Sequence, residues 1–566
     1  MRVEEFRSEL RARLQRHATD VLLRIAGSDN NCVALTGGDI LHESQRLAHL
    51  SIAPAGRVVL LLLPHSVELF LLHIGLILTG RVPAILPWPT SRVDPEKYQR
   101  NLLHQFHNLP AEELITIPKL ATNLRSALPY RVVGCQMEGI QLWEQTFSIT
   151  PPLLKDDLVK PGSVPSQDLG AALFLQFSGG TTGSQKAVVI TAPMLTLQLE
   201  SLREALLFSS QDVVVSWLPL YHDMGLIGCL WFPLWHASPS VQFPANDWLL
   251  NPGLLFEYLE RYRGTFCWLP NFAFSYMAMQ RRSMAGAYSL AHVRGYVNCS
   301  EPVRLHSLRG FVETFADWGV SMRQMQASYA MAENVFAVTQ TEIGREPSTV
   351  SRMAVVREGN GAPLAFDLFE DVYVSSGEPI GGTQVRIVNS QGNVCSQREA
   401  GEIQLSTESL FSGYWALKGI TSSPSTSEGW YATGDYGFMS TGELYVIGRL
   451  KDLVIVGGQN IVPEDVETVV NTISGIYQGR VVAFGIGNIN DTESLIVVAE
   501  MRGAYDRDRA AAMEKEIAIL VNTTIGIGPA HVRVLPERWI VKSTAGKISR
   551  RETRERYLCE YARQGT

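Results

Sequence analysis

A glycine- and threonine-rich segment at 178–187, SGGTTGSQKA, carries a dense set of groups that could bind phosphate. Glycines let the backbone approach a ligand closely and adopt positive φ, so successive N–H groups can converge on phosphate oxygens. Ser178, Thr181 and Thr182 would add hydroxyl donors, and Lys186 would add a mobile cation. The segment differs from the GxxxxGK[ST] loop because alanine follows the lysine. It predicts a polyphosphate cradle, with a polar surface turn as the alternative.

Four further side chains downstream are of types that could act beside such a cradle. His222 lies in LYHDMGLIG, Glu333 in AMAEN, Asp435 in ATGDYG and Lys547 in STAGKISR. A carboxylate after a glycine turn suits the two hydroxyls of a ribose, and a carboxylate is a ligand that Mg²⁺ prefers. Taken singly, His222 could be a core histidine and Glu333 a solvated helix residue.

The elements that must position these residues follow from the apolar pattern. A run at 173–177 predicts a strand leading into the glycine-rich segment, and a run at 187–191 leads away from it. From residue 1 to about 170, short apolar runs alternate with helical patterns, including a helix over 95–106. This alternation favours a parallel sheet flanked by helices. The alternation continues with apolar runs at 212–220, 266–269 and 293–298 and with a predicted helix at 225–235.

The remainder of the chain divides into two parts. Between about 372 and 448, short alternating runs separated by Gly, Ser and Asn turns predict a small antiparallel sheet or barrel. After the charged segment 449–452, residues 453–566 have strands and helices of their own. The expected fold class is α/β: a large N-terminal domain (1–448) of flanked sheets with a β-barrel-like subdomain, followed by a small α+β C-terminal domain.

Composition narrows the class of protein. The chain has 566 residues, 46% of them hydrophobic and 19% charged, as in ordinary globular proteins with more than one domain. A net charge of −7 argues against nucleic acid as the main ligand. Seven dispersed cysteines without a CxxC pair are typical of reduced thiols, so we expect a cytoplasmic protein.

Two segments bear on localisation. Residues 58–80 are long and apolar, but Pro64, Glu68 and His73 interrupt them, which favours a buried strand (58–63) and a core helix (66–79) over a membrane span. Residues 1–25 predict a charged amphipathic helix without the apolar core of a signal peptide.

The motifs, in order, resemble those of the adenylate-forming superfamily, which includes acyl-CoA synthetases, fatty acyl-AMP ligases, peptide-synthetase adenylation domains and luciferases. The resemblance covers about residues 30–555. It departs from the usual pattern at Gln185 and Ala187, where Pro and Gly are common, but neither change removes a donor. The matching segments are SGGTTGSQKA, LYHDMGLIG, NCSEPV, QASYAMAE, WYATGDYG with GRLKD, and VKSTAGKISR.

The resemblance implies a role for each motif. The cradle would hold the β- and γ-phosphates of ATP, Tyr329 would stack on adenine, and Asp435 would bind the ribose. Thr182 and Glu333 would coordinate Mg²⁺. The implied nucleotide-binding residues are Ser178, Gly180, Thr181, Thr182, Gly183, Lys186, Ser300, Glu301, Pro302, Ser328, Tyr329, Ala330, Met331, Asp435, Arg449 and Lys451.

The implied reaction is attack of a carboxylate on the α-phosphorus of ATP, giving acyl-AMP and pyrophosphate, by positioning and charge stabilisation. His222 and Lys547 would be the catalytic residues: His222 would lie beside the acyl tunnel, and Lys547 would neutralise charge developing on the carboxylate and α-phosphate. Lys451 would fall at a hinge (449–452) about which a mobile C-terminal domain rotates. Candidate tunnel residues are Trp217, Phe272, Phe274, Cys299 and Ser328.

The acceptor of the acyl group is the open question at this point. The long stretch 334–383 resembles the extra segment of fatty acyl-AMP ligases, which restrains the small domain. In that group of enzymes the adenylate passes to the phosphopantetheine arm of an acyl carrier protein. By contrast, GGQNIVPEDVE (457–467) resembles CoA or aryl-acid ligases more closely. We favour a carrier protein over free CoA, in a natural-product or lipid pathway. A non-catalytic nucleotide- or acyl-binding protein is the third alternative.

Overall fold

The computed structural model describes residues 1–27, 32–88, 111–124, 131–136, 169–178, 186–284, 286–357, 372–416, 419–421, 425–456, 459–487, 493–542 and 548–561, with isolated positions between 98 and 128. The predicted helix over 95–106 and the predicted loop over 150–170 lie largely or wholly outside these residues.

An eight-stranded sheet contains the two strands that flank the glycine-rich segment. Its order is β21-β20-β8-β7-β4-β3-β5-β6. Strands β3 to β7 pair in parallel, whereas β8 is antiparallel to β7 and β20 antiparallel to β8. The bounds are β3 Val58–Leu62, β4 Val82–Ile85, β5 Glu113–Thr116, β6 Arg131–Gly134, β7 Ala172–Phe177, β8 Ala187–Thr191, β20 Tyr414–Ala416 and β21 Gly419–Ile420.

A nine-stranded sheet carries the next motifs at the ends of its central strands. Its order is β17-β14-β13-β12-β11-β9-β10-β1-β2, and the pairs from β10 to β13 are parallel. The bounds are β1 Val21–Ala26, β2 Cys32–Thr36, β9 Val214–Ser216, β10 Ser240–Gln242, β11 Phe266–Leu269, β12 Gly295–Cys299, β13 Met325–Ala330, β14 Ala337–Gln340 and β17 Glu378–Pro379.

Helices accompany both sheets, as the alternation predicts. The core helix α3 has its N-terminus capped by the Ser66 hydroxyl and is buried along almost its whole length. No helix in the described ranges is long and apolar enough to cross a membrane. The helices before the last domain are α1 Val3–Arg16, α2 Gly37–Ala48, α3 Val67–Leu78, α5 Pro118–Leu124, α6 Ala192–Ala205, α7 Phe232–Trp235, α8 Ala245–Leu250, α9 Gly253–Arg261, α10 Asn271–Met279 and α11 Leu305–Phe315.

The predicted antiparallel region forms a four-stranded sheet of order β18-β19-β22-β23. A separate hairpin pairs β15 (Thr349–Ser351) with β16 (Val372–Val374). The bounds are β18 Thr383–Val388, β19 Gly401–Thr407, β22 Tyr431–Ser440 and β23 Glu443–Arg449.

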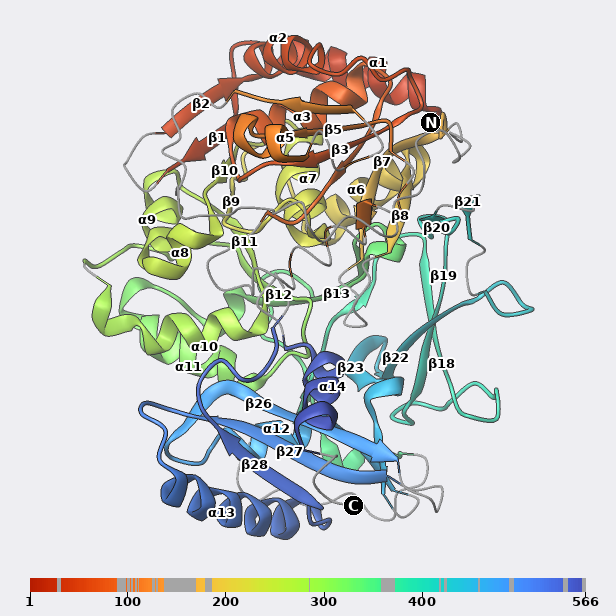
Figure 1. The fold of residues 1–566 in the computed structure, drawn as a ribbon. Coiled ribbons are helices and arrows are strands. Elements are labelled where there is room, and N and C mark those ends of the chain that lie inside the picture. The colour runs from red at the N-terminus through yellow and green to blue at the C-terminus, as the bar shows by residue number, and fades with distance from the viewer. Residues whose placement is uncertain are drawn as a thin grey trace.

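The C-terminal domain has a three-stranded sheet, β26-β27-β28, with helices beside it. Figure 1 shows α1 and α2 at one end of the molecule and α13 with β28 at the other, with β12 and β13 between them. The bounds are β24 Val454–Val456, β25 Gln459–Ile461, α12 Pro463–Val470, β26 Ile476–Gly487, β27 Glu493–Met501, α13 Arg507–Ile525, β28 His531–Leu535 and α14 Arg550–Glu560.

Two sequence predictions are wrong in detail. The N-terminal helix ends at Arg16, and the apolar run VLLRIA forms β1, because this run is buried between β10 and β2 in the nine-stranded sheet. The predicted helix 225–235 begins as a π-helix, η2 (Met224–Trp231), and only its last turn, α7, is α-helical.

Candidate active site

The ends of the glycine-rich segment are held together by its flanking strands. The Ser178 N–H donates to the Lys186 carbonyl at 2.9 Å, which continues the antiparallel ladder of β7 and β8. Of the predicted cradle residues, Gly180, Thr181, Thr182 and Gly183 lie outside the described residues, as does Lys547.

The predicted adenine and ribose residues are brought together from three strands. The Tyr329 hydroxyl, at the end of β13, donates to Asp435 Oδ2 at 2.6 Å. Asp435 on β22 lies opposite Arg449 on β23, and Arg449 Nε is 3.2 Å from Oδ1. Burial raises the pKa of Asp435, and Arg449 and Tyr329 partly oppose that shift. The three residues form one polar cluster, to which Tyr329 also contributes an aromatic ring.

Glu333 lies in a 3₁₀ turn directly after β13. Its Oε1 accepts a hydrogen bond from the Tyr414 hydroxyl at 2.7 Å, and its main-chain carbonyl accepts from Phe411 N–H at 2.8 Å. Burial raises the pKa of this carboxyl, while Tyr414 lowers it. The negative charge of Asp223 raises the same pKa and the positive charge of Arg449 lowers it. Glu333 therefore interacts electrostatically with both the His222 segment and the ribose cluster.

The turn after Glu333 is tied to the strand that leads into the cradle. Val335 has φ of 64° and ψ of −55°, a positive-φ turn conformation that is strained for a β-branched residue. Its carbonyl accepts from the Gln176 side chain on β7 at 3.1 Å. The buried Gln176 therefore joins the two sheets at the point where the cradle begins.

His222 lies at the start of the π-helix η2. Its Nδ1 is 2.5 Å from Asp223 Oδ1, which also accepts from Met224 N–H at 2.8 Å. Asp223 is thus the N-terminal cap of η2, and its carboxylate lies against the preceding histidine. A π-helix is a wider coil that frequently occurs at functional sites.

The predicted segment 300–302 has a defined local role. Ser300 follows β12 with φ of 74°, and Glu301 Oε2 accepts from Phe272 N–H at 3.0 Å in the first turn of α10. A carboxylate at a helix N-terminus satisfies a backbone donor there. Pro302 is partly exposed. Nucleotide contacts by these three residues stay a prediction.

Four of the five candidate tunnel residues lie in two groups. Trp217 stacks on Trp248 at 3.9 Å, and Phe272 lies 6.3 Å from the same Trp248 ring. Cys299 and Ser328 are direct neighbours across β12 and β13. Phe274, by contrast, packs in the core, 5.2 Å from Phe311.

The remaining predicted residues lie at the edges of the site. Ala330 is at a β-bulge, and the N–H of Met331 donates to the Phe336 carbonyl. Lys451 lies in the 3₁₀ turn after β23, where burial and the nearby Arg449 lower its pKa. Asp452 in the same turn contacts Arg550 of α14 at 3.0 Å.

Sequence reasoning missed Tyr414. It donates to Glu333, and Lys186 Nζ lies 4.5 Å from the centre of its ring. The only signal in the sequence is the glycine before it, Gly413, whose φ of 149° is accessible mainly to glycine.

No group of three or more His, Cys, Asp or Glu side chains in the described residues is placed to hold a metal ion. Glu333 offers a single partly buried carboxylate instead. That arrangement fits Mg²⁺, which usually binds through one or two carboxylates together with substrate phosphates.

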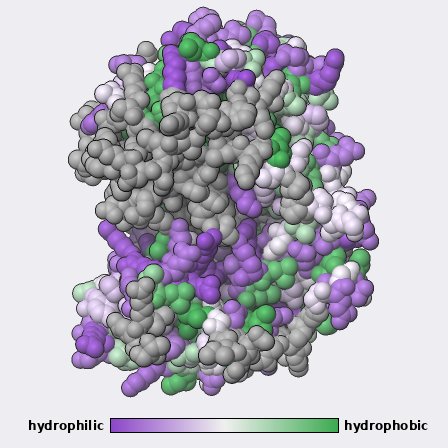
Figure 2. All heavy atoms as spheres, turned by 45° about the vertical axis from the view of Figure 1, so that its right-hand side comes forward, coloured by the Kyte–Doolittle hydropathy of each residue, from purple (hydrophilic) through white to green (hydrophobic). Residues whose placement is uncertain are grey.

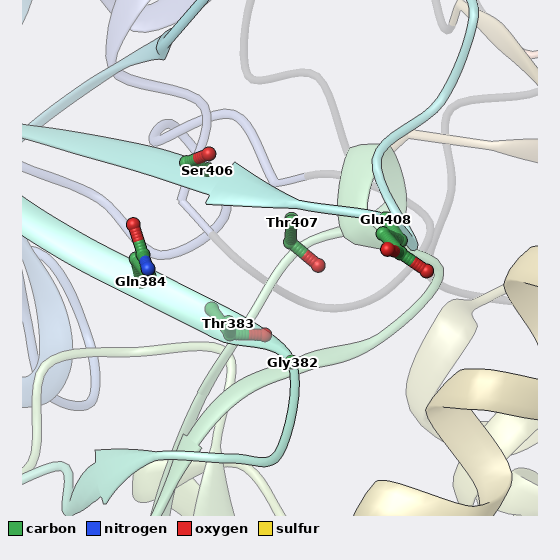
Figure 3. Close-up of a pocket in the computed structure, with 6 residues that line it drawn as sticks. All are labelled: Gly382, Thr383, Gln384, Ser406, Thr407 and Glu408. Carbon is green, nitrogen blue, oxygen red and sulfur yellow. The ribbon is translucent and has the colours of Figure 1, made fainter.

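A separate cavity of about 510 Å³ opens between β18 and β19, lined by Gly382, Thr383, Gln384, Ser406, Thr407 and Glu408 (Figure 3). None of the predicted site residues lines it. Figure 2 shows hydrophilic residues gathered across the middle of one face, between the upper part of the molecule and its C-terminal end.

Comparison with known proteins defines the class. The family model described as AMP-binding enzyme matches residues 12–415, so the chain belongs to the AMP-binding enzyme family. Together with the fold, this identifies an adenylate-forming enzyme, which uses ATP.

Among its relatives is a putative acyl-CoA synthetase from Caulobacter vibrioides, 32% identical over 409 residues, which are 69% of this chain and 71% of the relative. A long-chain-fatty-acid–AMP ligase from Mycobacterium marinum is 31% identical over 432 residues, 72% of this chain and 73% of the relative. A structure from a study of fatty acyl-adenylate ligases of E. coli and L. pneumophila matches with a TM-score of 0.80, at 23% identity and with 98% of both chains covered.

Proposed function

We propose that the protein activates a fatty or related carboxylic acid with ATP and then loads the acyl group onto an acyl carrier protein. The observation that carries the first step is the cluster of Tyr329, Asp435 and Arg449 beside Glu333, with the cradle strands joined to it through Gln176. In this proposal the ring of Tyr329 would contact adenine, the carboxylate of Asp435 would bind the ribose, and the carboxylate of Glu333 would lie on the phosphate side.

In the first step, a carboxylate oxygen of the acid bonds to the α-phosphorus of ATP, and the bond to the β-phosphate side breaks to release pyrophosphate. Asp435 accepts hydrogen bonds from the ribose hydroxyls, and Tyr329 stacks on adenine. Lys186 binds the β- and γ-phosphates, and Lys547 neutralises charge on the reacting oxygens. No side-chain nucleophile is required.

Glu333 would hold Mg²⁺ against the phosphates, with the Thr182 hydroxyl as second protein ligand. The ion would supply neutralisation of phosphate charge. Glu333 itself is kept in place by Tyr414 and by the hydrogen bond from Phe411 to its main chain.

His222 would contact the acid. Its ring is mostly buried and lies against the Asp223 carboxylate. The stacked pair Trp217–Trp248 and Cys299 would supply apolar contacts for the acyl chain. Such contacts would favour an acyl acid over a substrate with a charged side chain.

In the second step, a thiol attacks the acyl carbonyl, loses its proton, and AMP leaves. An ion-pair network supports a carrier-bound thiol as the acceptor. Asp465 on α12 is 6% exposed, and Arg352 in the stretch 334–383 contacts it at 2.6 Å. Arg357 and Arg304 lie 3.6 and 3.9 Å from the same carboxylate. The network joins that stretch to the C-terminal domain, as expected of a segment that restrains domain rotation about 449–452.

The relative named as a putative acyl-CoA synthetase favours free CoA as a second candidate acceptor. The two acceptors are separated by supplying each thiol alone and identifying the acylated product.

Adenylation itself is tested by acid-dependent exchange between pyrophosphate and ATP. A Lys547→Ala variant should lose exchange by about a thousandfold, as for removal of a group that stabilises transition-state charge, while retaining ATP binding. The matched control is Lys515→Ala, which changes an exposed lysine on α13. Full exchange in Lys547→Ala would contradict the assigned role, and absence of exchange in the native protein with every acid would indicate a non-catalytic binder.

A further inference from the structure

Tyr414 contacts two groups of opposite charge through two different parts of its side chain. Its hydroxyl donates to Glu333 Oε1 at 2.7 Å. The Lys186 ammonium lies 4.5 Å from its ring centre, within the range of a cation–π contact. One half-buried side chain thus joins the carboxylate after β13 to the last residue of the cradle.

The β-ladder explains why the ring is beside Lys186. Strand β20 pairs antiparallel with β8, with Tyr414 opposite Val188 and Trp415 opposite Ala187. Because Lys186 directly precedes β8, the first residue of β20 is placed next to the end of the cradle. The contact therefore follows from the strand register of β20 against β8.

A glycine fixes the approach to this strand. Gly413 has φ of 149°, and a Cβ at that position would overlap the Thr421 carbonyl oxygen in the β20–β21 hairpin. Both the conformation and the close approach require glycine. The backbone entering Tyr414 is therefore held in one path.

Neighbouring side chains fix the ring as well. Phe411 packs 4.7 Å from the Tyr414 ring at 57°, and its N–H donates to the Glu333 carbonyl. The Ser409 hydroxyl donates to Asn334 Oδ1 at 2.7 Å. The segment 409–414 thus holds Glu333 by its main chain, its neighbour and its carboxylate.

We propose that Tyr414 is a positioning residue for adenylation: its hydroxyl fixes the rotamer of Glu333, and its ring holds the Lys186 ammonium at the cradle until phosphate takes it. The inference rests on the proposed function, since it takes Glu333 and Lys186 as groups that bind the phosphate end of ATP. One oxygen of Glu333 accepts from the hydroxyl, and the ligand would bind at the other.

Two substitutions separate the two contacts. Tyr414→Phe removes the hydroxyl and keeps the ring, so the Mg²⁺ concentration for half-maximal ATP binding should rise about tenfold, as for loss of a hydrogen bond to a charged group. The affinity for ATP without metal should stay within about twofold of that of the native protein, because the variant keeps the cation–π contact between the ring and Lys186. Tyr414→Leu removes both contacts, and metal-free ATP binding should also weaken about threefold.

The measurement is calorimetric titration of the full-length protein with ATP, with and without MgCl₂, beside its thermal unfolding temperature. Tyr505→Phe, a half-exposed tyrosine after β27, is the control and should match the native protein. Binding does not require turnover, so the result is independent of whether acyl-AMP is formed. Unchanged Mg²⁺ dependence in Tyr414→Phe would overturn the proposal, as would equal weakening of metal-free binding in both variants. Failure of pyrophosphate exchange in the native protein would instead count against the proposed function.

Discussion

Asp435 uses both of its carboxylate oxygens, one toward Tyr329 and one toward Arg449. The buried carboxylate is thereby held in one orientation by groups from two other strands, which is the preorganisation that a ribose site needs. The positive charge of Arg449 also favours the ionised form of Asp435, which burial disfavours.

Asp435→Asn keeps the size of the side chain and removes its charge. We expect the KM for ATP to rise about tenfold to a hundredfold, because the ribose loses a charged acceptor and the half-exposed Arg449 loses its carboxylate partner. Steady-state kinetics and titration with AMP measure this effect. Asp508→Asn, on the exposed first turn of α13, should change neither value; an unaltered KM in Asp435→Asn would exclude a ribose contact.

His73 predicts a pH dependence of stability. The side chain lies in the core of α3, where Trp231 Nε1 donates to its Nε2 at 3.1 Å, and burial lowers its pKa to about 3. Between that value and its ordinary pKa of 6.5 the unfolded chain binds a proton that the folded chain does not. The free energy of unfolding therefore falls as pH falls below 6.5, by about 2 kcal/mol between pH 7.5 and 5.

Urea unfolding of the native protein and His73→Gln at both pH values measures this term. The variant should show a pH-dependent loss smaller by about 2 kcal/mol, whatever its stability at neutral pH. The same loss in both proteins would place the titrating group elsewhere. His65, whose pKa burial lowers to about 4, remains in both and contributes equally.

At the residue level, site residues that lie in a recognisable motif can be predicted from the sequence. Site residues that only the fold brings together cannot. Tyr329, Asp435 and Arg449 lie in recognisable segments, and they meet in the structure. Tyr414 is 81 positions from Glu333, and its contact depends on the register of β20 against β8, which no local pattern specifies.

The π-helix η2 is the element that sets the geometry of the His222 segment. Gly225 in its first turn lies against the carbonyl oxygens of Pro219 and Leu218, where a Cβ would overlap them. The close approach holds the loop between β9 and η2 against the helix. A substitution here therefore moves His222 through the backbone.

Gly225→Ala should destabilise the protein by about 1–3 kcal/mol and lower kcat/KM for the acid. The matched control is Gly310→Ala in α11, where a Cβ meets nothing within 4 Å. That change should be neutral or stabilising by about 0.5–1 kcal/mol, since alanine is the better helix former. Thermal unfolding and acid-dependent kinetics of both variants test the difference; equal stability of the two would contradict it.

Elements with a clear period were predictable, and those decided by tertiary pairing were not. The strands on either side of the cradle and the helix α3 are confirmed. A π-helix and an α-helix have similar apolar patterns, so η2 could not be distinguished. The run VLLRIA was assigned to a helix because its strand partners, β10 and β2, are set by the fold.

At the scale of the whole molecule, Asp465 on α12 forms ion pairs with three arginines that precede the C-terminal domain in the chain. Burial alone would raise the pKa of this carboxyl, but Arg352, Arg357 and Arg304 lower it. The ion pairs are therefore intact throughout the physiological pH range. A second set joins Arg550 on α14 to Asp452, Glu464 and Glu467 and fastens the turn at 450–452 to the domain that follows it.

Asp465→Asn should loosen the C-terminal domain, because it leaves three partly buried guanidinium groups without this carboxylate. We expect proteolytic cleavage near 449–452 to become about tenfold faster at neutral pH, since loss of a buried partner strongly favours opening. Glu516→Gln, exposed on α13, is the control. An unchanged cleavage rate in Asp465→Asn would show that the network does not restrain the domain.

The central claim is the formation of acyl-AMP followed by transfer to a carrier-bound thiol. The most direct measurement incubates the protein with ATP, Mg²⁺, carboxylic acids of graded chain length, and either CoA or a phosphopantetheinylated carrier protein, with products read by mass spectrometry. We expect acyl-AMP to accumulate in the presence of CoA and to be consumed when the carrier is supplied, with one group of acids preferred. Rapid formation of acyl-CoA would contradict carrier loading, and no acyl-AMP from any acid would contradict adenylation itself.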